Sequence, residues 1–272
     1  MKMFKVFVIN LAKDIERRKY IENHLNEKGL VYELIEGVYG KDFSEDEINK
    51  IADLKLSYKK MGKTISINEI GCSLSHQKIY KKIVSENLEG AFIIEDDAMF
   101  CSNINMIFTS IHINRSKFKS NCWLGLFKSY IDMKNKVFDI DKNFSVYESP
   151  RVRCTIAYYI DNLAAQNLLQ YNKKIIYVAD WFFGKYLNKL NLYAINEACV
   201  MPNPSFESTI GETRKKELNM LKAIYIYFRK TYKRMYYYKY NFGMLTGRYK
   251  KTQLSDELLK IKKSLNLTNA RL

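Results

Sequence analysis

The chain has 272 residues, a formal net charge of +16 and 47% hydrophobic residues. This hydrophobic content excludes a disordered chain, and the length suits one large α/β domain with an extension, or two small domains. The five cysteines are scattered without a CxxC pair or zinc spacing, which favours free thiols in a reducing compartment. The N-terminus does not resemble a signal peptide, and no run reaches the roughly 18 apolar residues of a membrane span. We therefore expect a cytoplasmic protein.

The opening of the chain predicts a β-α-β unit. Residues 4–9 predict a strand, residues 14–28 a helix and residues 31–35 a second strand, an order that favours a parallel sheet. Arg17 and Arg18 lie in the helix near the carboxyl end of the first strand. Free amides and the helix dipole attract anions there. A solvated basic face is the alternative interpretation of the two arginines.

A block of small residues opens the next long helix. Residues 44–52 first predict a short helix with a Ser–Glu capping box, and residues 54–64 predict a mobile polar loop. The block Gly71-Cys72-Ser73-Leu74-Ser75-His76 then lies in a helix expected to run to about residue 87. A mid-helix glycine costs about 1 kcal/mol, so we expect another backbone or a ligand to approach closely here. His76 either forms a structural hydrogen bond or contacts the site.

Three consecutive acids follow a buried strand. Residues 91–94 are apolar, and Glu95, Asp96 and Asp97 come directly after them. Unpaired carboxylates cannot stay in the interior, so the strand must end and deliver them to the sheet edge, where ligands of open α/β sheets bind. Alternation along the strand places Glu95 and Asp97 on one side and Asp96 on the other. Such a pair suits Mg²⁺ or Mn²⁺, whereas an acidic strand exit held by Lys or Arg is the alternative.

Further strands and helices follow the acidic run. Residues 129–147 predict a loop or β-ribbon beside the active site. The remaining pattern predicts a helix within residues 103–121, buried strands at 122–127 and 154–160, a helix at 162–171 capped by Asp161, and short strands at 192–195 and 198–201.

Asp180 is a single acid among aromatic residues. Such surroundings favour a raised pKa, which makes Asp180 a candidate base or sugar ligand. The alternative is the N-cap of a helix over residues 181–190.

The C-terminal part of the chain changes composition. Residues 218–255 contain nine Lys or Arg and no acid, together with many tyrosines. Aromatic and basic residues bind single-stranded nucleic acid, or they lie at an anionic membrane, where each basic residue contributes about 1 kcal/mol. A helical tail packed on its own domain is the third interpretation, and residues 255–265 predict a last amphipathic helix. We divide the chain into a catalytic domain, residues 1–215, and a basic, Tyr-rich helical extension, residues 216–272.

Four pieces in order carry a family resemblance. They are residues 8–11 followed by Arg17-Arg18, the Gly71–His76 block, residues 93–97, and Asp180. Together they resemble glycosyltransferase family 25, the lipopolysaccharide and lipooligosaccharide biosynthesis enzymes related to collagen galactosyltransferases, over roughly residues 4–210. The resemblance implies a GT-A-like fold, which is a Rossmann-type mixed, mostly parallel sheet flanked by helices. It also implies a UDP-galactose or UDP-glucose donor, inversion at the anomeric carbon, and Mn²⁺ or Mg²⁺ at the acidic motif.

The resemblance also assigns site residues. Asp97 and Glu95 would bind the metal, with Asp97 the firmer ligand because the usual GT-A motif is Asp-x-Asp. The residues that it places near the nucleotide-sugar donor are Asn10, Leu11, Arg17, Arg18, Ser75 and His76. We expect Asp180 to be the catalytic base with Asp96 as its competitor, and Trp181 and Phe182 to stack on a sugar.

Two rival functions use the same features. The acids and the basic tail also suit a metal-dependent phosphoryl-transfer enzyme or nuclease, although such sites usually draw on several separated acids and a lysine. A non-catalytic nucleic-acid-binding protein is the third possibility, but residues 1–210 contain no helix-turn-helix or RNP pattern. Under the favoured hypothesis, the protein uses a lipid-linked or oligosaccharide acceptor and lies peripherally on the inner face of the cytoplasmic membrane. It has no nucleic acid partner.

Overall fold

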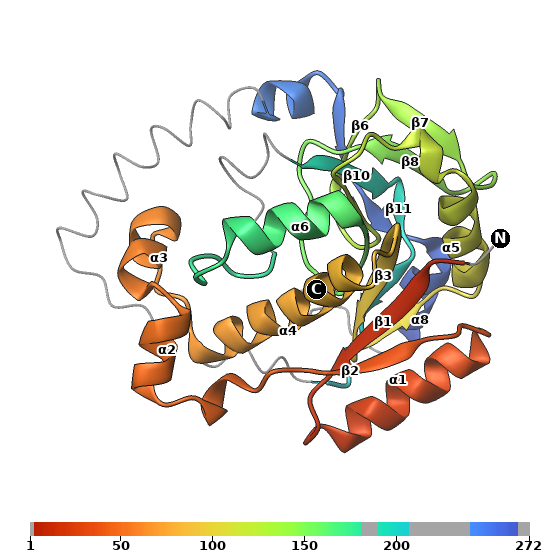
Figure 1. The fold of residues 1–272 in the computed structure, drawn as a ribbon. Helices are drawn as coiled ribbons and strands as arrows, with labels where there is room; N and C mark the ends of the chain where they lie inside the picture. Colours follow the sequence, from red (N-terminus) through yellow and green to blue (C-terminus); the bar gives the residue numbers. More distant parts are fainter. Residues whose placement is uncertain (1–2, 181–189, 207–239, 266–272) are drawn as a thin grey trace.

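A central sheet of eight strands organises the fold, in the order β2-β1-β3-β9-β5-β10-β8-β7 (Figure 1). The structure is a computed structural model that describes residues 3–180, 190–206 and 240–265. β2, β1, β3, β5, β10 and β7 run in one direction, and β9 and β8 run against them. The strands of this sheet are β1 (Lys5–Asn10), β2 (Glu33–Glu36), β3 (Gly90–Glu95), β5 (Cys122–Gly125), β7 (Lys136–Asp139), β8 (Ser145–Glu148), β9 (Ala157–Asp161) and β10 (Asn191–Ile195).

Helices cover both faces of the sheet (Figure 1). One face packs on α4 and α6 through Ile79, Ile83 and Leu168, and the other packs on α1 and α5 through Ile21 and Phe108. The helices are α1 (Ile15–Glu27), α2 (Glu45–Ile51), α3 (Leu54–Met61), α4 (Ile67–Ser85), α5 (Ile104–Ile113), α6 (Asn162–Tyr171) and α8 (Asp256–Ser264), with 3₁₀ turns η1 (Gly40–Asp42) and η2 (Arg115–Lys117). This mixed, mostly parallel sheet between helices is consistent with the GT-A-like fold that the sequence predicts.

Local signals account for most of these elements. The parallel β1-α1-β2 unit is confirmed, and Ser44 and Glu47 form the expected capping box at the start of α2. A second capping box, from Ser66 and Glu69, starts α4. The Asp161 side chain accepts a hydrogen bond from the Ala164 N–H and caps α6 as predicted.

The loop expected at residues 54–64 is wrong, because most of this stretch forms α3. The Asp53 side chain accepts a hydrogen bond from the Leu56 N–H at its start, and Gly62, at φ 76°, ends it in the left-handed conformation that favours glycine. Buried Met61 packs with α2 and α4, which stabilises a helix whose exposed positions are mostly lysine.

The segment at residues 129–147 forms a ribbon, but not beside the acidic strand. β7 and β8 pair antiparallel, and the sheet order places them at the edge opposite β2. Sequence alone cannot order the strands of a sheet, so this location could not be anticipated.

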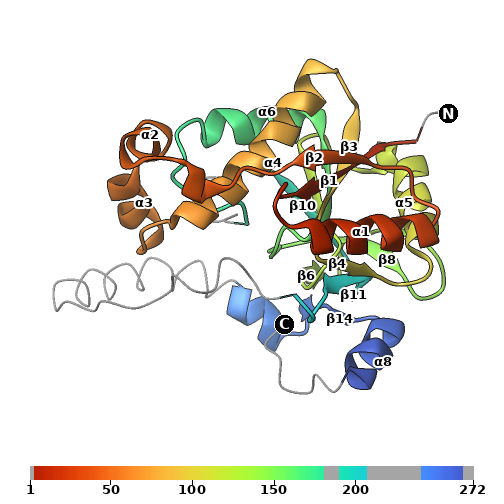
Figure 2. The same cartoon turned by 90° about the horizontal axis from the view of Figure 1, so that it is seen from below.

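The C-terminal residues that the structure describes pack onto the main sheet unit. β13 (Tyr249–Lys251) pairs with β6 (Tyr130–Asp132), and β14 (Gln253–Leu254) pairs with β11 (Glu197–Ala198). Leu254 and Leu258 are buried in the main core, and Figure 2 shows β14 and α8 beside β11. The predicted boundary at residue 215 falls outside the described residues, so it stays a prediction.

Two short strands close the loop after the acidic run. β4 (Ala98–Phe100) pairs antiparallel with β12 (Val200–Pro202).

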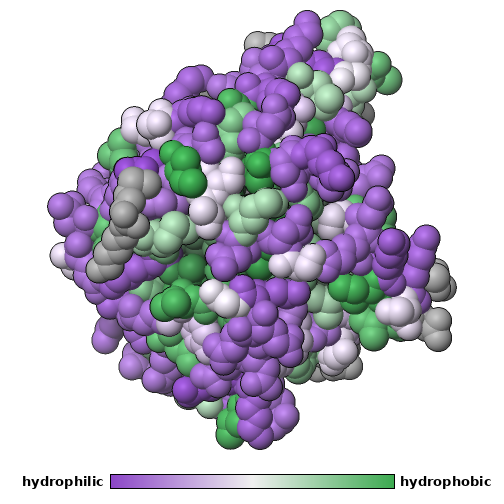
Figure 3. All heavy atoms as spheres, turned by 90° about the vertical axis from the view of Figure 1, so that its right-hand side faces the viewer, coloured by the Kyte–Doolittle hydropathy of each residue, from purple (hydrophilic) through white to green (hydrophobic). Residues whose placement is uncertain are grey.

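The surface on the right of Figure 1 is mostly hydrophilic, with hydrophobic side chains in small separate groups (Figure 3). Among the helices of residues 3–180, 190–206 and 240–265, none combines the length and apolar character that crossing a bilayer requires.

Candidate active site

A pocket lies at the carboxyl ends of β1, β2 and β3. Together with the solvent at its mouth it encloses about 620 Å³. The carboxyl edge of the strands is where open α/β sheets bind ligands, because the loops that leave neighbouring strands diverge there. The residues that line the pocket are Ile9, Leu11, Arg17, Val38, Tyr39, Gly40, Asn68, Cys72, Ser75, His76, Glu95 and Asp96.

The small residues of α4 form one wall by close backbone packing. A Cβ atom on Gly71 would lie 2.6 Å from the Val38 carbonyl oxygen and 2.7 Å from the Gly40 nitrogen. The Val38 N–H donates a hydrogen bond of 2.8 Å to Ser75 Oγ. The glycine therefore admits the loop after β2 rather than a ligand, and Ser75 holds this loop in place. The close approach that the sequence predicts is confirmed, with a backbone as the partner.

Arg17 binds two of the three acids. Its guanidinium contacts Asp96 Oδ1 at 3.0 Å and Asp97 Oδ2 at 2.6 Å, and it lies over the ring of Phe206, 5.4 Å from the centroid. Asp96 and Asp97 thus converge on one cation, and the alternation predicted for them is wrong. The strand ends at Glu95 and the chain turns through the next two residues, so the period of two stops there.

The two acids beside Arg17 differ in their surroundings. Burial raises the pKa of Asp97 to about 7, the charge of Glu95 adds to this rise, and Arg17 opposes it. Within the described part of the chain, the buried Oδ1 of Asp97 accepts no hydrogen bond. Asp96 is buried, which raises its pKa, whereas Arg17 and the amide of Asn10 oppose the rise. Asn10 Nδ2 donates to Asp96 Oδ2 at 2.8 Å, so Asn10 acts through Asp96.

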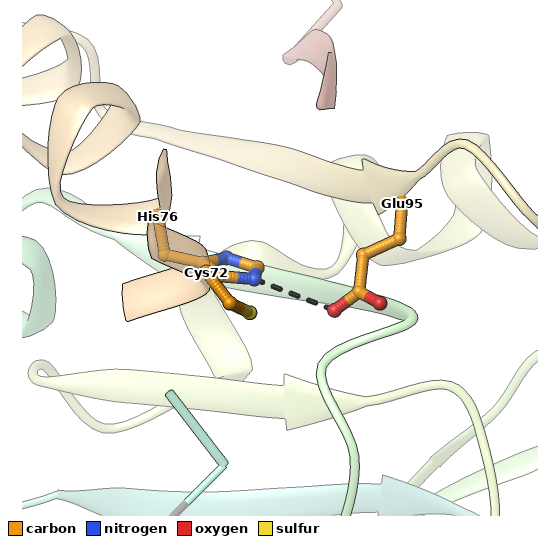
Figure 4. A group of neighbouring side chains, drawn as sticks. All are labelled: Cys72, His76 and Glu95. Atoms are coloured by element: carbon orange, nitrogen blue, oxygen red, sulfur yellow. Dashed lines mark ion pairs between the residues drawn. The ribbon is translucent and has the colours of Figure 1, made fainter. Parts of the chain in front are cut away.

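The Glu95 carboxylate contacts Thr155 and faces His76 of α4. The Thr155 hydroxyl donates a hydrogen bond of 2.6 Å to Glu95 Oε1, and His76 Nε2 lies 3.4 Å from the same oxygen. Burial by itself raises the pKa of Glu95, but His76, Thr155 and Arg17 outweigh it and lower the pKa below its ordinary value. Cys72 faces the same pair, one helical turn before His76 (Figure 4).

A buried pair of tyrosines fixes the His76 ring. His76 Nδ1 and the Tyr158 hydroxyl lie 2.8 Å apart, and the Tyr158 hydroxyl is 2.8 Å from that of Tyr80. His76 is 1% exposed, so its orientation is set by the core and not by solvent. Its Nε2 atom is consequently directed at Glu95.

Asp180 ends the described stretch at the same side of the molecule. Its side chain is exposed by surface area, yet the protein atoms around it raise the pKa of its carboxyl, and the charge of Glu95 adds to the rise. The raised pKa agrees with the expectation for a candidate base. The predicted helix over residues 181–190 and the stacking role of Trp181 and Phe182 lie outside the described residues.

The predicted donor-site residues divide into two groups. Leu11, Arg17, Ser75 and His76 line the pocket. Arg18 instead forms an exposed ion pair with Glu22 at 3.2 Å on the surface of α1, so its assignment to the nucleotide stays a prediction without support from this geometry.

Sequence reasoning missed several pocket residues. Cys72 lies four residues before His76, a helical spacing that could have paired the two side chains. Thr155 follows Cys154, whose φ of 65° redirects the chain toward Glu95, and no local pattern signals this. Tyr39 comes from the loop after β2, and Asn68 comes from the first turn of α4.

The fold and the site define an α/β protein with a ligand-binding pocket at the carboxyl edge of its sheet, and comparison with known proteins narrows the class. Residues 3–183 match the family model described as "Glycosyltransferase family 25 (LPS biosynthesis protein)". The chain belongs to glycosyltransferase family 25, which confirms the resemblance carried by its four motifs.

Curated relatives match over a shorter stretch. Procollagen galactosyltransferase 1-A of Xenopus laevis is 33% identical over 105 residues, 37% of this chain and 17% of that protein. A glycosyltransferase 25 family member of Aedes aegypti is 35% identical over 100 residues, 35% of this chain and 16% of that protein. A probable inactive glycosyltransferase 25 family member 3 of Bos taurus is 31% identical over 102 residues, 36% of this chain and 17% of that protein. The alignments therefore span about one sixth of each relative's length.

Proposed function

We propose that this protein is an inverting glycosyltransferase that moves a hexose, with galactose favoured, from a UDP-sugar to a saccharide acceptor in lipopolysaccharide or lipooligosaccharide synthesis. The family description names lipopolysaccharide biosynthesis, and a similar protein is named a galactosyltransferase. The observation that carries the proposal is the convergence of three separate motifs on one pocket. Arg17, His76 and Glu95 come from different elements and meet at the carboxyl edge of the sheet.

The donor set at the acidic run fits a hard divalent cation. Asp97 has a buried, unpaired carboxylate oxygen and a pKa raised by burial and by Glu95, two signs of missing positive charge. Asp97 and Glu95 would hold Mn²⁺ or Mg²⁺ through carboxylate oxygens, which such ions prefer. The bound cation would stabilise the charge that develops on the leaving diphosphate.

The residues of the chain have separate roles in this proposal. Arg17 is the fixed cation of the pocket and would orient the diphosphate, while Asn10 keeps Asp96 in place. Asp180 would take the proton of the acceptor hydroxyl as that oxygen attacks the anomeric carbon from the face opposite the diphosphate. Its raised pKa brings it closer to the operating pH, where a general base is most effective. Asp96 is the competing base, but a hydrogen bond from Asn10 and an ion pair with Arg17 already engage its two carboxylate oxygens.

A donor screen tests the function. Purified protein with Mn²⁺ is incubated with UDP-galactose, UDP-glucose and other UDP-hexoses, each with a panel of soluble saccharide acceptors, and free UDP is measured. We expect one donor to be turned over and EDTA to abolish the turnover. Failure of every UDP-sugar to turn over, and to raise the melting temperature in Mn²⁺, would contradict the proposal. Salt-sensitive binding of DNA or RNA in place of turnover would favour the nucleic-acid alternatives.

A peripheral position on the inner face of the cytoplasmic membrane belongs to the same proposal. Its support is the basic, tyrosine-rich composition of the C-terminal extension. Residues 240–265 belong to the fold, so deleting the extension would also damage the core; charge removal is the cleaner test. Changing Arg229, Lys230, Lys233, Arg234 and Lys239 to Gln should reduce binding to anionic vesicles and leave turnover of a soluble acceptor. Unchanged vesicle binding would contradict the membrane role.

A further inference from the structure

The side chains of Cys72, His76 and Glu95 line the pocket and converge on one point. The Cys72 sulfur, a ring nitrogen of His76 and a carboxylate oxygen of Glu95 all lie within 4.8 Å of one another (Figure 4). Two of the three come from α4 at positions i and i+4, which lie on one face of a helix, and the third comes from the end of β3. We propose that these three side chains form a site for a borderline divalent transition-metal ion such as Zn²⁺.

The ligand set selects the type of ion. Thiolate sulfur and imidazole nitrogen bind Zn²⁺ and similar transition metals, whereas Mg²⁺ and Mn²⁺ prefer oxygen. Three protein ligands with a fourth position open is the arrangement of non-structural zinc sites. The site is therefore chemically distinct from the all-oxygen site proposed at Asp97, although both use Glu95.

The geometry of two ligands already suits such an ion. His76 Nε2 and Glu95 Oε1 lie 3.4 Å apart. Two ligands of a tetrahedral Zn²⁺ with bonds of about 2.0 Å lie about 3.3 Å apart. The Cys72 side chain is half-buried and lines the pocket, so an ion can reach the sulfur from solvent.

The His76 ring is fixed with its free nitrogen toward the site. Nδ1 is engaged with the Tyr158 hydroxyl, while the buried Nε2 makes no hydrogen bond within the described residues. Metal-binding histidines usually have the second nitrogen held in this way, which sets the tautomer and the ring orientation. With Nδ1 held by Tyr158, Nε2 is the ring nitrogen that faces the Glu95 carboxylate.

The neighbourhood also favours a cation. The Glu95 carboxylate lies within 4.8 Å of the Cys72 sulfur and of the His76 ring nitrogen, so it offers a negative charge to an ion held between them. When the ion binds, the thiol proton passes to solvent as the sulfur–metal bond forms, so no oxidant or reductant is needed. Both proposed sites use the Glu95 carboxylate, so Zn²⁺ and Mn²⁺ would compete for it. Binding of Zn²⁺ beside Cys72 would therefore weaken Mn²⁺ binding and slow the proposed transferase reaction.

Co²⁺ is the probe that distinguishes the two kinds of site. It replaces Zn²⁺ and reports sulfur coordination through a thiolate-to-cobalt charge-transfer band in the near ultraviolet. Co²⁺ is added to the full-length protein, with no donor or acceptor present, and Zn²⁺ is then added. We expect the band to appear and Zn²⁺ to abolish it. Because this assay needs no turnover, its outcome is independent of whether the protein transfers a sugar.

Variants identify the ligands. Cys72→Ser should eliminate the band, and Glu95→Gln should keep it while weakening Co²⁺ binding at least about 10-fold, an effect as large as loss of an outer-shell partner. Tyr158→Phe should weaken binding about 10-fold through loss of the ring's partner. Cys101→Ala is a matched control, because Cys101 lies beside Cys199 and a thiol pair of this kind would also give the signal.

Three results would overturn the proposal. They are the absence of a charge-transfer band in the wild-type protein, a band that survives Cys72→Ser, and a band lost in Cys101→Ala. Circular dichroism and melting curves in EDTA confirm that each variant is folded. If Cys72→Ser does not fold, Cys72→Ala takes its place. In addition, the wild-type protein is labelled with a maleimide, and Zn²⁺ should protect the Cys72 thiol from labelling. Equal labelling with and without Zn²⁺ would count against the site.

Discussion

Replacing Arg17 by Met should strongly destabilise the protein while keeping the shape of the apolar stem. Arg17 is the shared cation of two acids, and the exposed fractions of the three side chains are 16% for Arg17, 7% for Asp96 and 18% for Asp97. Removing one partner of a buried ion pair costs about 3–5 kcal/mol, because the other charge remains unpaired. Residual exposure and proton uptake by one carboxyl reduce this cost, so we expect about 3 kcal/mol near neutral pH.

Thermal melting measures this loss against a neighbouring control. At about 2–4 °C per kcal/mol for a chain of this size class, the melting temperature should fall by about 6–12 °C. Arg18→Met removes a cation one residue away whose partner, Glu22, lies on the exposed surface of α1. Such a pair is worth about 0.5 kcal/mol, so its variant should melt within about 2 °C of the wild type.

The comparison also tests the function of the acidic run. Arg17→Met should lose turnover at temperatures well below its melting point, whereas Arg18→Met should keep it if Arg18 stays outside the pocket. If Mn²⁺ binds at Asp97, it should raise the melting temperature of Arg17→Met more than that of the wild type. Equal destabilisation by both variants would refute the reasoning. It would mean that the loss of stability on removing an arginine does not depend on how deeply its acidic partners are buried.

Three further variants test separate parts of the structure. Gly71→Ala forces a Cβ atom against the Val38 carbonyl, so the free energy of unfolding in urea should fall by about 1–3 kcal/mol and donor affinity should fall as well. Wild-type values would mean that the loop after β2 moves aside without cost. Asp161→Ala removes the cap of α6 and the acceptor of the Cys122 N–H, so the free energy of unfolding in urea should fall by about 2 kcal/mol. Asp161→Asn keeps an acceptor oxygen and should lose less. Asp180→Asn should lower kcat at least about 100-fold with donor Kd unchanged, and near-normal kcat would transfer the role of base to Asp96.

The elements of the fold could be predicted where local chemistry determines them. Ser44 with Glu47 begins a helix, and Asp161 begins another, because each caps amides within its own turn. The apolar run of β3 ending in three carboxylates predicts a strand that stops at the sheet edge, and it stops at Glu95. The helix over α3 was missed because its apolar positions are few and its stability comes from packing against α2 and α4.

The sequence by itself therefore determined where the chemistry lies: an acidic strand end, an arginine on the first helix and the Gly71–His76 block, together with the family they define. These are properties of short segments, fixed by charge, burial and backbone preference. Only the tertiary structure decided which side chains meet. Arg17 takes Asp96 and Asp97, whereas Glu95 turns to His76 and Cys72. That division depends on sheet order and on the turn after β3, where the alternation of strand side chains ends and contacts across the fold take over.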